Sequence, residues 1–170
     1  VAKNLSDRNI DLAPLAVVGA LGDIQDKYDQ RSLGSLNKVI VEDVEKTNGI
    51  KVETDLMLFG RETRPIHKAL AYTTTPYIPG ISGEEDKSFA LIANLGIKPK
   101  EDDKWRALRD LTREEKEKLF SALAEHLTSM GIKSDLATSL LGTTYTLNRE
   151  EPWTPLRDAR EFSMLLNATG

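Results

Sequence analysis

Signals that start and stop helices recur along most of this chain, and they constrain its fold more than any other feature of the sequence. Thr112 and Glu115 have the spacing of a capping box, and Gly131 ends the apolar pattern that follows them. Ser82 and Glu85 have the same spacing. Because an amphipathic stripe between such signals is typical of a helix, we expect helices over 82–96 and 112–130.

Shorter segments complete the expected organisation. Further helices are predicted over 12–22, from Ser32 or Ser35 to about residue 47, over 65–72, after Ser134 and over 158–166. Alternating apolar residues over 50–59 and the β-prone residues 143–147 predict strands. Two short strands do not form a sheet that stands alone. We therefore expect a mainly α chain with one or two short strands, an α+β fold.

The segment 12–22 has an alternative interpretation. It is the longest run without polar side chains, and periodicity does not separate a buried helix from a buried strand in so short a run. Asp11 as N-cap and Pro14 in the first turn favour the helix. A membrane span needs about 20 such residues, and no basic segment of a signal peptide precedes the run. We expect no membrane contact and a cytoplasmic location.

Composition removes several classes of function. The 170 residues include no Cys and two His. These counts exclude a disulfide scaffold, a zinc finger and a thiol nucleophile, and they leave little for a His-rich metal cluster. With 23 Lys and Arg against 27 Asp and Glu, the net charge is -4. The overall charge therefore does not indicate nucleic-acid binding.

Asp23 is the candidate metal ligand of this sequence. It follows Gly22 at the end of the apolar run, where a carboxylate can reach a cation and a cation would offset the helix dipole. Asp26 and Asp29 lie three and six residues further on and could complete a cation site. The alternative is a solvated helix end with ordinary surface acids.

Two basic groups are candidate ligand sites. Arg61, Arg64, His67 and Lys68 surround Pro65, a grouping that suits a phosphate or a carboxylate-bearing partner. The alternative is a solvated helix start.

The second group consists of Arg149, Arg157 and Arg160 near Trp153. Arginines beside an aromatic ring are typical of single-stranded nucleic-acid binding. The alternative is ion pairing with nearby acids, namely Glu150, Glu151, Asp158 and Glu161.

Several blocks of this sequence resemble archaeal RecJ-like proteins of the DHH phosphoesterase superfamily. Residues 13–27 (APLAVVGALGDIQDK) resemble the fourth motif of that superfamily, and Gly19 and Asp23 have its Gly-to-Asp spacing. The blocks 53–74, 76–81, 145–152 and 154–162 resemble the same proteins, in the same order along the chain.

The resemblance implies a Mn²⁺- or Mg²⁺-dependent 5′-to-3′ exonuclease on single-stranded DNA or RNA, with a role in replication through the GINS complex and replicative-helicase partners. It implies that Asp23 is one carboxylate of a two-metal site and that Arg157 contacts phosphate. Residues 1–47 would then end the DHH domain, 48–145 would be a mostly helical insertion, and 146–170 would begin the DHH-associated domain.

Other motifs of the superfamily do not occur in these residues. Neither His has a His neighbour, so the Asp-His-His motif is missing, as is the Gly-rich, His-bearing motif of the DHH-associated domain. Two-metal catalysis needs several carboxylates and usually His. We therefore expect a central segment of a longer enzyme, without nuclease activity by itself. The alternative is a catalytically inert module that binds partners.

Overall fold

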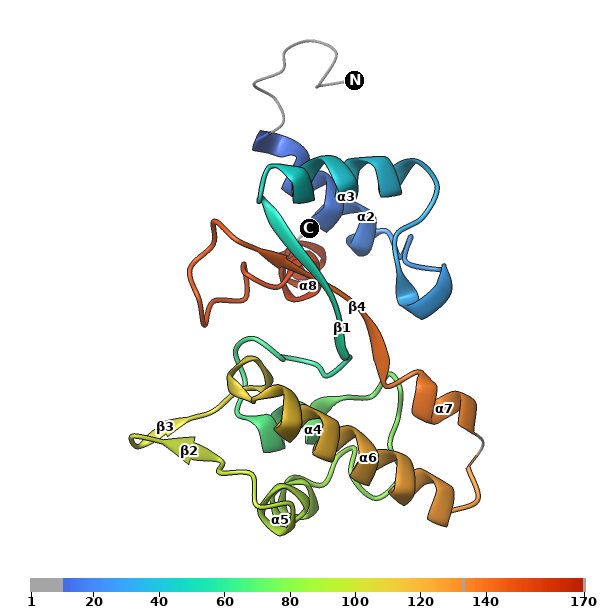
Figure 1. Ribbon diagram of the computed structural model, residues 1–170, viewed down its shortest axis with the longest axis vertical. Helices are drawn as coiled ribbons and strands as arrows, with labels where there is room; N and C mark the ends of the chain where they lie inside the picture. Colours follow the sequence, from blue (N-terminus) through green and yellow to red (C-terminus); the bar gives the residue numbers. More distant parts are fainter. Residues whose placement is uncertain (1–10, 133, 170) are drawn as a thin grey trace. The chain divides into compact units, whose positions relative to one another are not determined.

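The computed structural model describes residues 11–132 and 134–169 (Figure 1). The chain forms two compact units: unit 1 comprises Val1–Asp55 and Gly142–Gly170, and unit 2 comprises Leu56–Leu141. The chain passes from one unit to the other at two strands, β1 (Ile50–Leu56) and β4 (Leu141–Leu147), which pair in a two-stranded sheet. Helices predominate over these short strands, so the α+β expectation is confirmed.

Unit 1 is built around α2 (Ala13–Gly22), which packs against α3 (Leu36–Lys46) and α8 (Ala159–Thr169). Figure 1 shows α2 and α3 side by side. The helical interpretation of 12–22 is therefore right. The expected N-cap is wrong, because Leu12 occupies that position and the Asp11 carboxylate instead accepts a hydrogen bond from Arg149 (2.7 Å).

The apolar faces of α3 and α8 are turned differently from what their patterns predict. Leu36 and Val39 are exposed, whereas Val41 and Val44 are buried. On α8, the helical pattern predicts that Phe162, Leu165 and Leu166 face inward, but Leu165 and Leu166 are exposed. Within unit 1 each of these helices is covered by α2 along one face only, so apolar side chains elsewhere on it stay at the surface.

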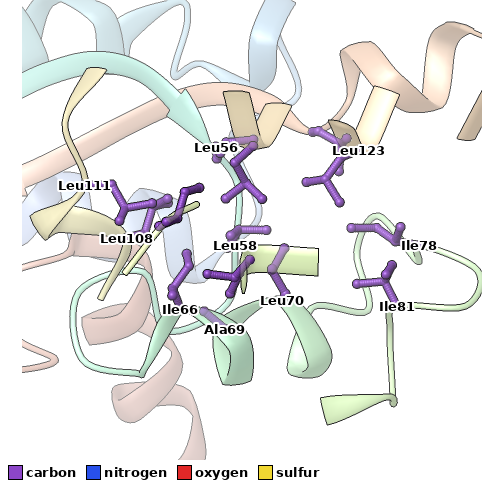
Figure 2. Close-up of a cluster of buried hydrophobic side chains, with 14 of the residues drawn as sticks. Leu56, Leu58, Ile66, Ala69, Leu70, Ile78, Ile81, Leu108, Leu111 and Leu123 are labelled. Atoms are coloured by element: carbon purple, nitrogen blue, oxygen red, sulfur yellow. The ribbon is translucent and has the colours of Figure 1, made fainter. Parts of the chain in front are cut away.

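Unit 2 is a helical unit with a small hairpin. Its helices are α4 (Ile66–Tyr72), α5 (Glu85–Asn94), α6 (Arg113–Ser129), α7 (Ser134–Thr138) and a short 3₁₀ turn, Leu108–Asp110. The hairpin pairs β2 (Lys100–Glu101) with β3 (Lys104–Trp105), in a segment that the sequence predicts only as a charged turn. Figure 2 shows Ile66, Ala69 and Leu70 of α4 beside Leu58 in the hydrophobic core of this unit.

Only one of the two predicted capping boxes forms. The Thr112 hydroxyl accepts from the Glu115 backbone N–H (3.2 Å), and the Glu115 carboxylate accepts from Thr112 N–H (2.8 Å), so α6 begins as expected. Ser82 does not cap α5, which has Glu84 at its N-cap. The Ser82 hydroxyl is buried and bonds the loop before the helix instead, donating to the Thr73 carbonyl (2.5 Å).

Within the part of the chain that the structure describes, none of the helices combines the length and the hydropathy of a transmembrane span.

Candidate functional site

Asp23 ends α2 with an exposed side chain. Its backbone N–H donates to the Gly19 carbonyl (3.0 Å), and its carboxylate accepts a hydrogen bond from the Gln25 side-chain amide (2.6 Å). The Gln25 carbonyl oxygen in turn accepts from the Asn37 amide (2.6 Å). The Gln25 amide thus holds a solvent-facing carboxylate and is itself held by Asn37. Its role as a metal ligand stays a prediction.

The expected trio of Asp23, Asp26 and Asp29 does not form a cation site. Asp26 is buried, pairs with Arg160 and accepts from Arg31 Nε (3.2 Å). Across residues 11–132 and 134–169, no group of three or more His, Asp and Glu side chains is arranged to hold a metal ion. That prediction is wrong because two guanidinium groups already neutralise the middle carboxylate.

The second basic group of the sequence is largely committed to protein oxygens. Arg160 also donates to the carbonyls of Arg31 (2.9 Å) and Thr143 (3.3 Å). Arg149 pairs with Asp11, and Arg157 Nη1 donates to a backbone carbonyl, that of Glu150 (2.5 Å). Intramolecular pairing is therefore the better interpretation for Arg149 and Arg160, with partners that the sequence does not indicate. A phosphate contact by Arg157 stays a prediction.

The basic group around Pro65 lies in unit 2 and is divided between the interior and the surface. Arg61 and His67 are each 6% exposed, so the alternative of a solvated helix start is wrong for them. The turn that carries Arg61 is tied to the 3₁₀ segment, because Arg109 N–H donates to its carbonyl (3.3 Å) and the Arg109 guanidinium pairs with Glu62. Phosphate binding by Arg61 and His67 is untested and stays a prediction.

Arg64 lies between two aromatic rings. Its guanidinium carbon is 4.6 Å from the centre of the Phe59 ring and 4.8 Å from that of Tyr72. The turn needs a glycine at position 60, because its φ of +77° disfavours other residues and a Cβ there would overlap the Arg64 side chain. Among the described residues no carboxylate lies within ion-pair distance of Arg64, so π faces hold this cation.

His67 lies on α4 between the rings of Phe89 (5.4 Å between ring centres) and Trp105 (4.9 Å). Burial lowers the pKa of the imidazole; the nearby Glu85 carboxylate opposes this shift in pKa and Lys68 reinforces it. Its Nδ1 is buried and has no hydrogen-bond partner in the structure. An unpartnered buried nitrogen is uncommon and indicates a neutral ring at the edge of an incomplete site.

Glu85 and Lys100 extend this arrangement on either side. The Tyr72 hydroxyl donates to the Glu85 carboxylate (2.6 Å), and this hydrogen bond raises the pKa of Tyr72 and lowers that of Glu85. Lys100 Nζ lies 4.4 Å from the centre of the Trp105 ring. The contacts form two groups, Phe59, Arg64 and Tyr72 in one and Phe89, Lys100 and Trp105 around His67 in the other. Glu85, which bonds Tyr72 and lies near His67, connects them, and the six residues are here together named the aromatic–cation face.

The exposed apolar and basic residues around 59–81 are the partner or substrate face that the sequence leads us to expect, and this segment contains Phe59, Arg64 and Tyr72. The four rings are 36–45% exposed, but Phe89 and Trp105 lie outside that segment. Phe89 fits the apolar stripe of α5, and Trp105 begins a short apolar patch. No local spacing would have joined them, because α4, α5 and the hairpin meet only in the folded unit.

One comparison with known proteins finds a similarity for this unit. Residues 58–141, just under half of the chain, match the family described as the DHH-CID domain. Unit 2 is similar to the DHH-CID domain. The match is consistent with the DHH superfamily, and its limits lie close to those of unit 2, Leu56–Leu141.

A second comparison covers nearly the whole chain. The uncharacterized protein MJ0831 of Methanocaldococcus jannaschii is 32% identical over 160 residues, which are 94% of this chain and 31% of that protein. The chain thus spans about a third of the length of the relative that it matches.

Proposed function

We propose that this chain is a segment of a metal-dependent phosphodiesterase of the DHH type, similar to archaeal RecJ-like 5′-to-3′ exonucleases that act on single-stranded nucleic acid in DNA repair and replication. The similarity of residues 58–141 to the DHH-CID domain carries the proposal. The alignment with one third of a longer relative also supports it.

The described residues do not by themselves fit a two-metal site. Asp23 supplies one exposed carboxylate, the oxygen donor that Mn²⁺ and Mg²⁺ prefer, and Gln25 orients it. No further His, Asp or Glu side chains join it in a group that could hold an ion within 11–132 and 134–169. A bound metal pair would stabilise the attacking and leaving oxygens of phosphodiester hydrolysis. No catalytic step is therefore assigned to these residues alone.

Metal titration of the chain tests this proposal. In calorimetry with Mn²⁺ we expect no tight stoichiometric binding by the 170-residue chain, and no cleavage of a single-stranded oligonucleotide. In a longer protein that contains this chain together with an Asp-His-His motif, Asp23→Asn should abolish cleavage while Asp29→Asn should not. Tight Mn²⁺ binding by the 170 residues that is lost in Asp23→Asn would contradict the expectation that these residues do not hold the metal without the rest of a longer enzyme.

A partner-binding module is the second candidate function. The absence of a three-ligand metal group among the described residues favours it, and the partners to be tested are GINS and components of a replicative helicase. Co-elution of the chain with such a purified complex in size-exclusion chromatography, without any nuclease activity in the longer protein, would favour this candidate over the first.

A further inference from the structure

We propose that the aromatic–cation face of unit 2 binds single-stranded nucleic acid without cleaving it. The inference takes its class of ligand from the proposed function, but its evidence comes from contacts within unit 2. It assigns a binding surface to a unit in which no described residues form a metal-holding group.

The rings of this face are available to a ligand. Phe59, Tyr72, Phe89 and Trp105 are 36–45% exposed, although their combined apolar area would fill a core. Exposed large rings gathered on one surface indicate a binding site more often than rings scattered singly. Nucleobases stack on such rings whatever their sequence, because every base has a π face.

The cations of this face are available as well. Neither Arg64 nor Lys100 has a carboxylate within ion-pair distance among the described residues; each lies over a ring instead. Elsewhere in unit 2, Arg106 pairs with Glu115 (2.6 Å) and Arg113 with Glu117 (2.8 Å). A cation held by π faces keeps its charge for an outside anion, and a phosphate beside a stacked base supplies that anion.

His67 gives an independent indication of an incomplete site. Its side chain is more than nine-tenths buried, it contacts both Phe89 and Trp105, and its Nδ1 has no partner. An imidazole nitrogen without a partner between two rings is suited to a hydrogen bond with a base edge or a phosphate. The same rings and the same nitrogen thus point to a ligand that stacks and also carries polar groups.

Fluorescence anisotropy of a labelled 20-residue oligodeoxythymidylate tests the proposal on the full chain. The titration is done at low salt with EDTA, so that metal-dependent cleavage does not contribute. We expect the double variant Arg64→Gln/Lys100→Gln to bind at least about 10-fold more weakly and to lower the slope of log K against log salt by up to about 1.4, at about 0.7 for each phosphate contact.

The matched control is Arg113→Gln/Lys118→Gln, which makes the same change in charge on the exposed side of α6. This control should bind within about 2-fold of the original chain. Circular dichroism checks that all variants are folded. Equal losses in the two double variants, or no binding by the original chain, would overturn the proposal.

A spectroscopic measurement separates stacking from charge attraction. The chain has two Trp residues, so Trp153→Phe leaves Trp105 as the single indole. We expect its fluorescence to be quenched by oligodeoxythymidylate and unaffected by polyglutamate at equal charge. Binding of polyglutamate with equal strength would show that the face takes an acidic protein segment and would refute the proposal.

Failure here is distinguishable from failure of the proposed function. Binding is measured on the full chain without metal and depends on residues of unit 2, whereas cleavage is measured with metal and depends on Asp23. Either result can be negative while the other is positive.

Discussion

Arg160 in unit 1 and Arg64 in unit 2 have different kinds of partner. In unit 1, Arg160 is surrounded by oxygens: the buried Asp26 carboxylate and two backbone carbonyls. In unit 2, Arg64 lies between Phe59 and Tyr72 with no carboxylate partner among the described residues. Both belong to basic groups that look alike in the sequence. The difference teaches that basic groups that look alike in a sequence can be held by protein oxygens in one unit and by aromatic rings in another.

The largest expected loss of stability comes from removing the carboxylate that pairs with Arg160. Asp26→Ala leaves the Arg160 and Arg31 guanidinium groups without their shared carboxylate, and removing one partner of a buried ion pair costs about 3–5 kcal/mol. Urea unfolding followed by circular dichroism measures the loss. The exposed Asp29→Ala should change stability by less than about 0.5 kcal/mol. Similar losses in both variants would show that the buried Asp26 pairing contributes no more to unit 1 than a surface carboxylate does.

Replacing arginine by lysine sharpens the comparison at constant charge. Lysine is a point charge without the planar fork, so Arg160→Lys leaves buried oxygen acceptors unsatisfied and should cost about 1–3 kcal/mol. Arg64→Lys should cost less than about 0.5 kcal/mol, because a lysine ammonium can also lie over a ring. Thermal unfolding of the two variants side by side decides the matter, and a larger loss in Arg64→Lys would reverse the interpretation.

The free energy of unfolding should also depend on pH through His67, which contacts the rings of Phe89 and Trp105. Because burial lowers the pKa of His67, the unfolded chain takes up a proton near pH 6.5 that the folded chain resists, and stability is lost as the pH falls through that value. We expect the difference in unfolding free energy between about pH 7.5 and pH 5 to shrink in His67→Phe. His126→Gln should leave the contribution of His67 in place. An unchanged pH dependence in His67→Phe would show that carboxylates alone cause it.

Removing the ring-stacked cation outright should cost more than Arg64→Lys but less than the substitutions of Asp26 and Arg160 in unit 1. Arg64→Ala should lower the free energy of unfolding by about 0.5–1 kcal/mol, the usual strength of an exposed cation–π contact. Chemical denaturation at two protein concentrations measures it. A loss comparable to that of Asp26→Ala would mean that Arg64 holds unit 2 together and is not reserved for a ligand.

Local signals in the sequence predict the helices well but not their faces. The Thr112 capping box, the helix from Pro65 and the left-handed stop at Asn48 all form, because each depends on residues within one turn. Ser82 fails as a cap because its hydroxyl finds a partner in a loop that the local sequence does not show.

The candidate site is less predictable for the same reason. Asp23 and Arg64 are visible as single residues, but their surroundings come from distant parts of the chain. The partner of Arg160 lies 134 residues away. The rings around His67 come from α5 and the β2–β3 hairpin. Spacing along one helix or strand carries no information about such contacts, so neither the Asp26 pairing nor the contact of His67 with Phe89 and Trp105 could be predicted.

The two ends of unit 2 lie next to each other, so this unit can be transferred to other proteins. Met57 near its start donates a backbone hydrogen bond to the carbonyl of Leu140 near its end (2.8 Å). A segment whose two ends meet can be cut out, and a short connector between Asp55 and Gly142 would close the gap at little entropic cost. The segment 56–141 is therefore suited to grafting into an exposed loop of an unrelated carrier, where its binding could be studied apart from any catalytic domain.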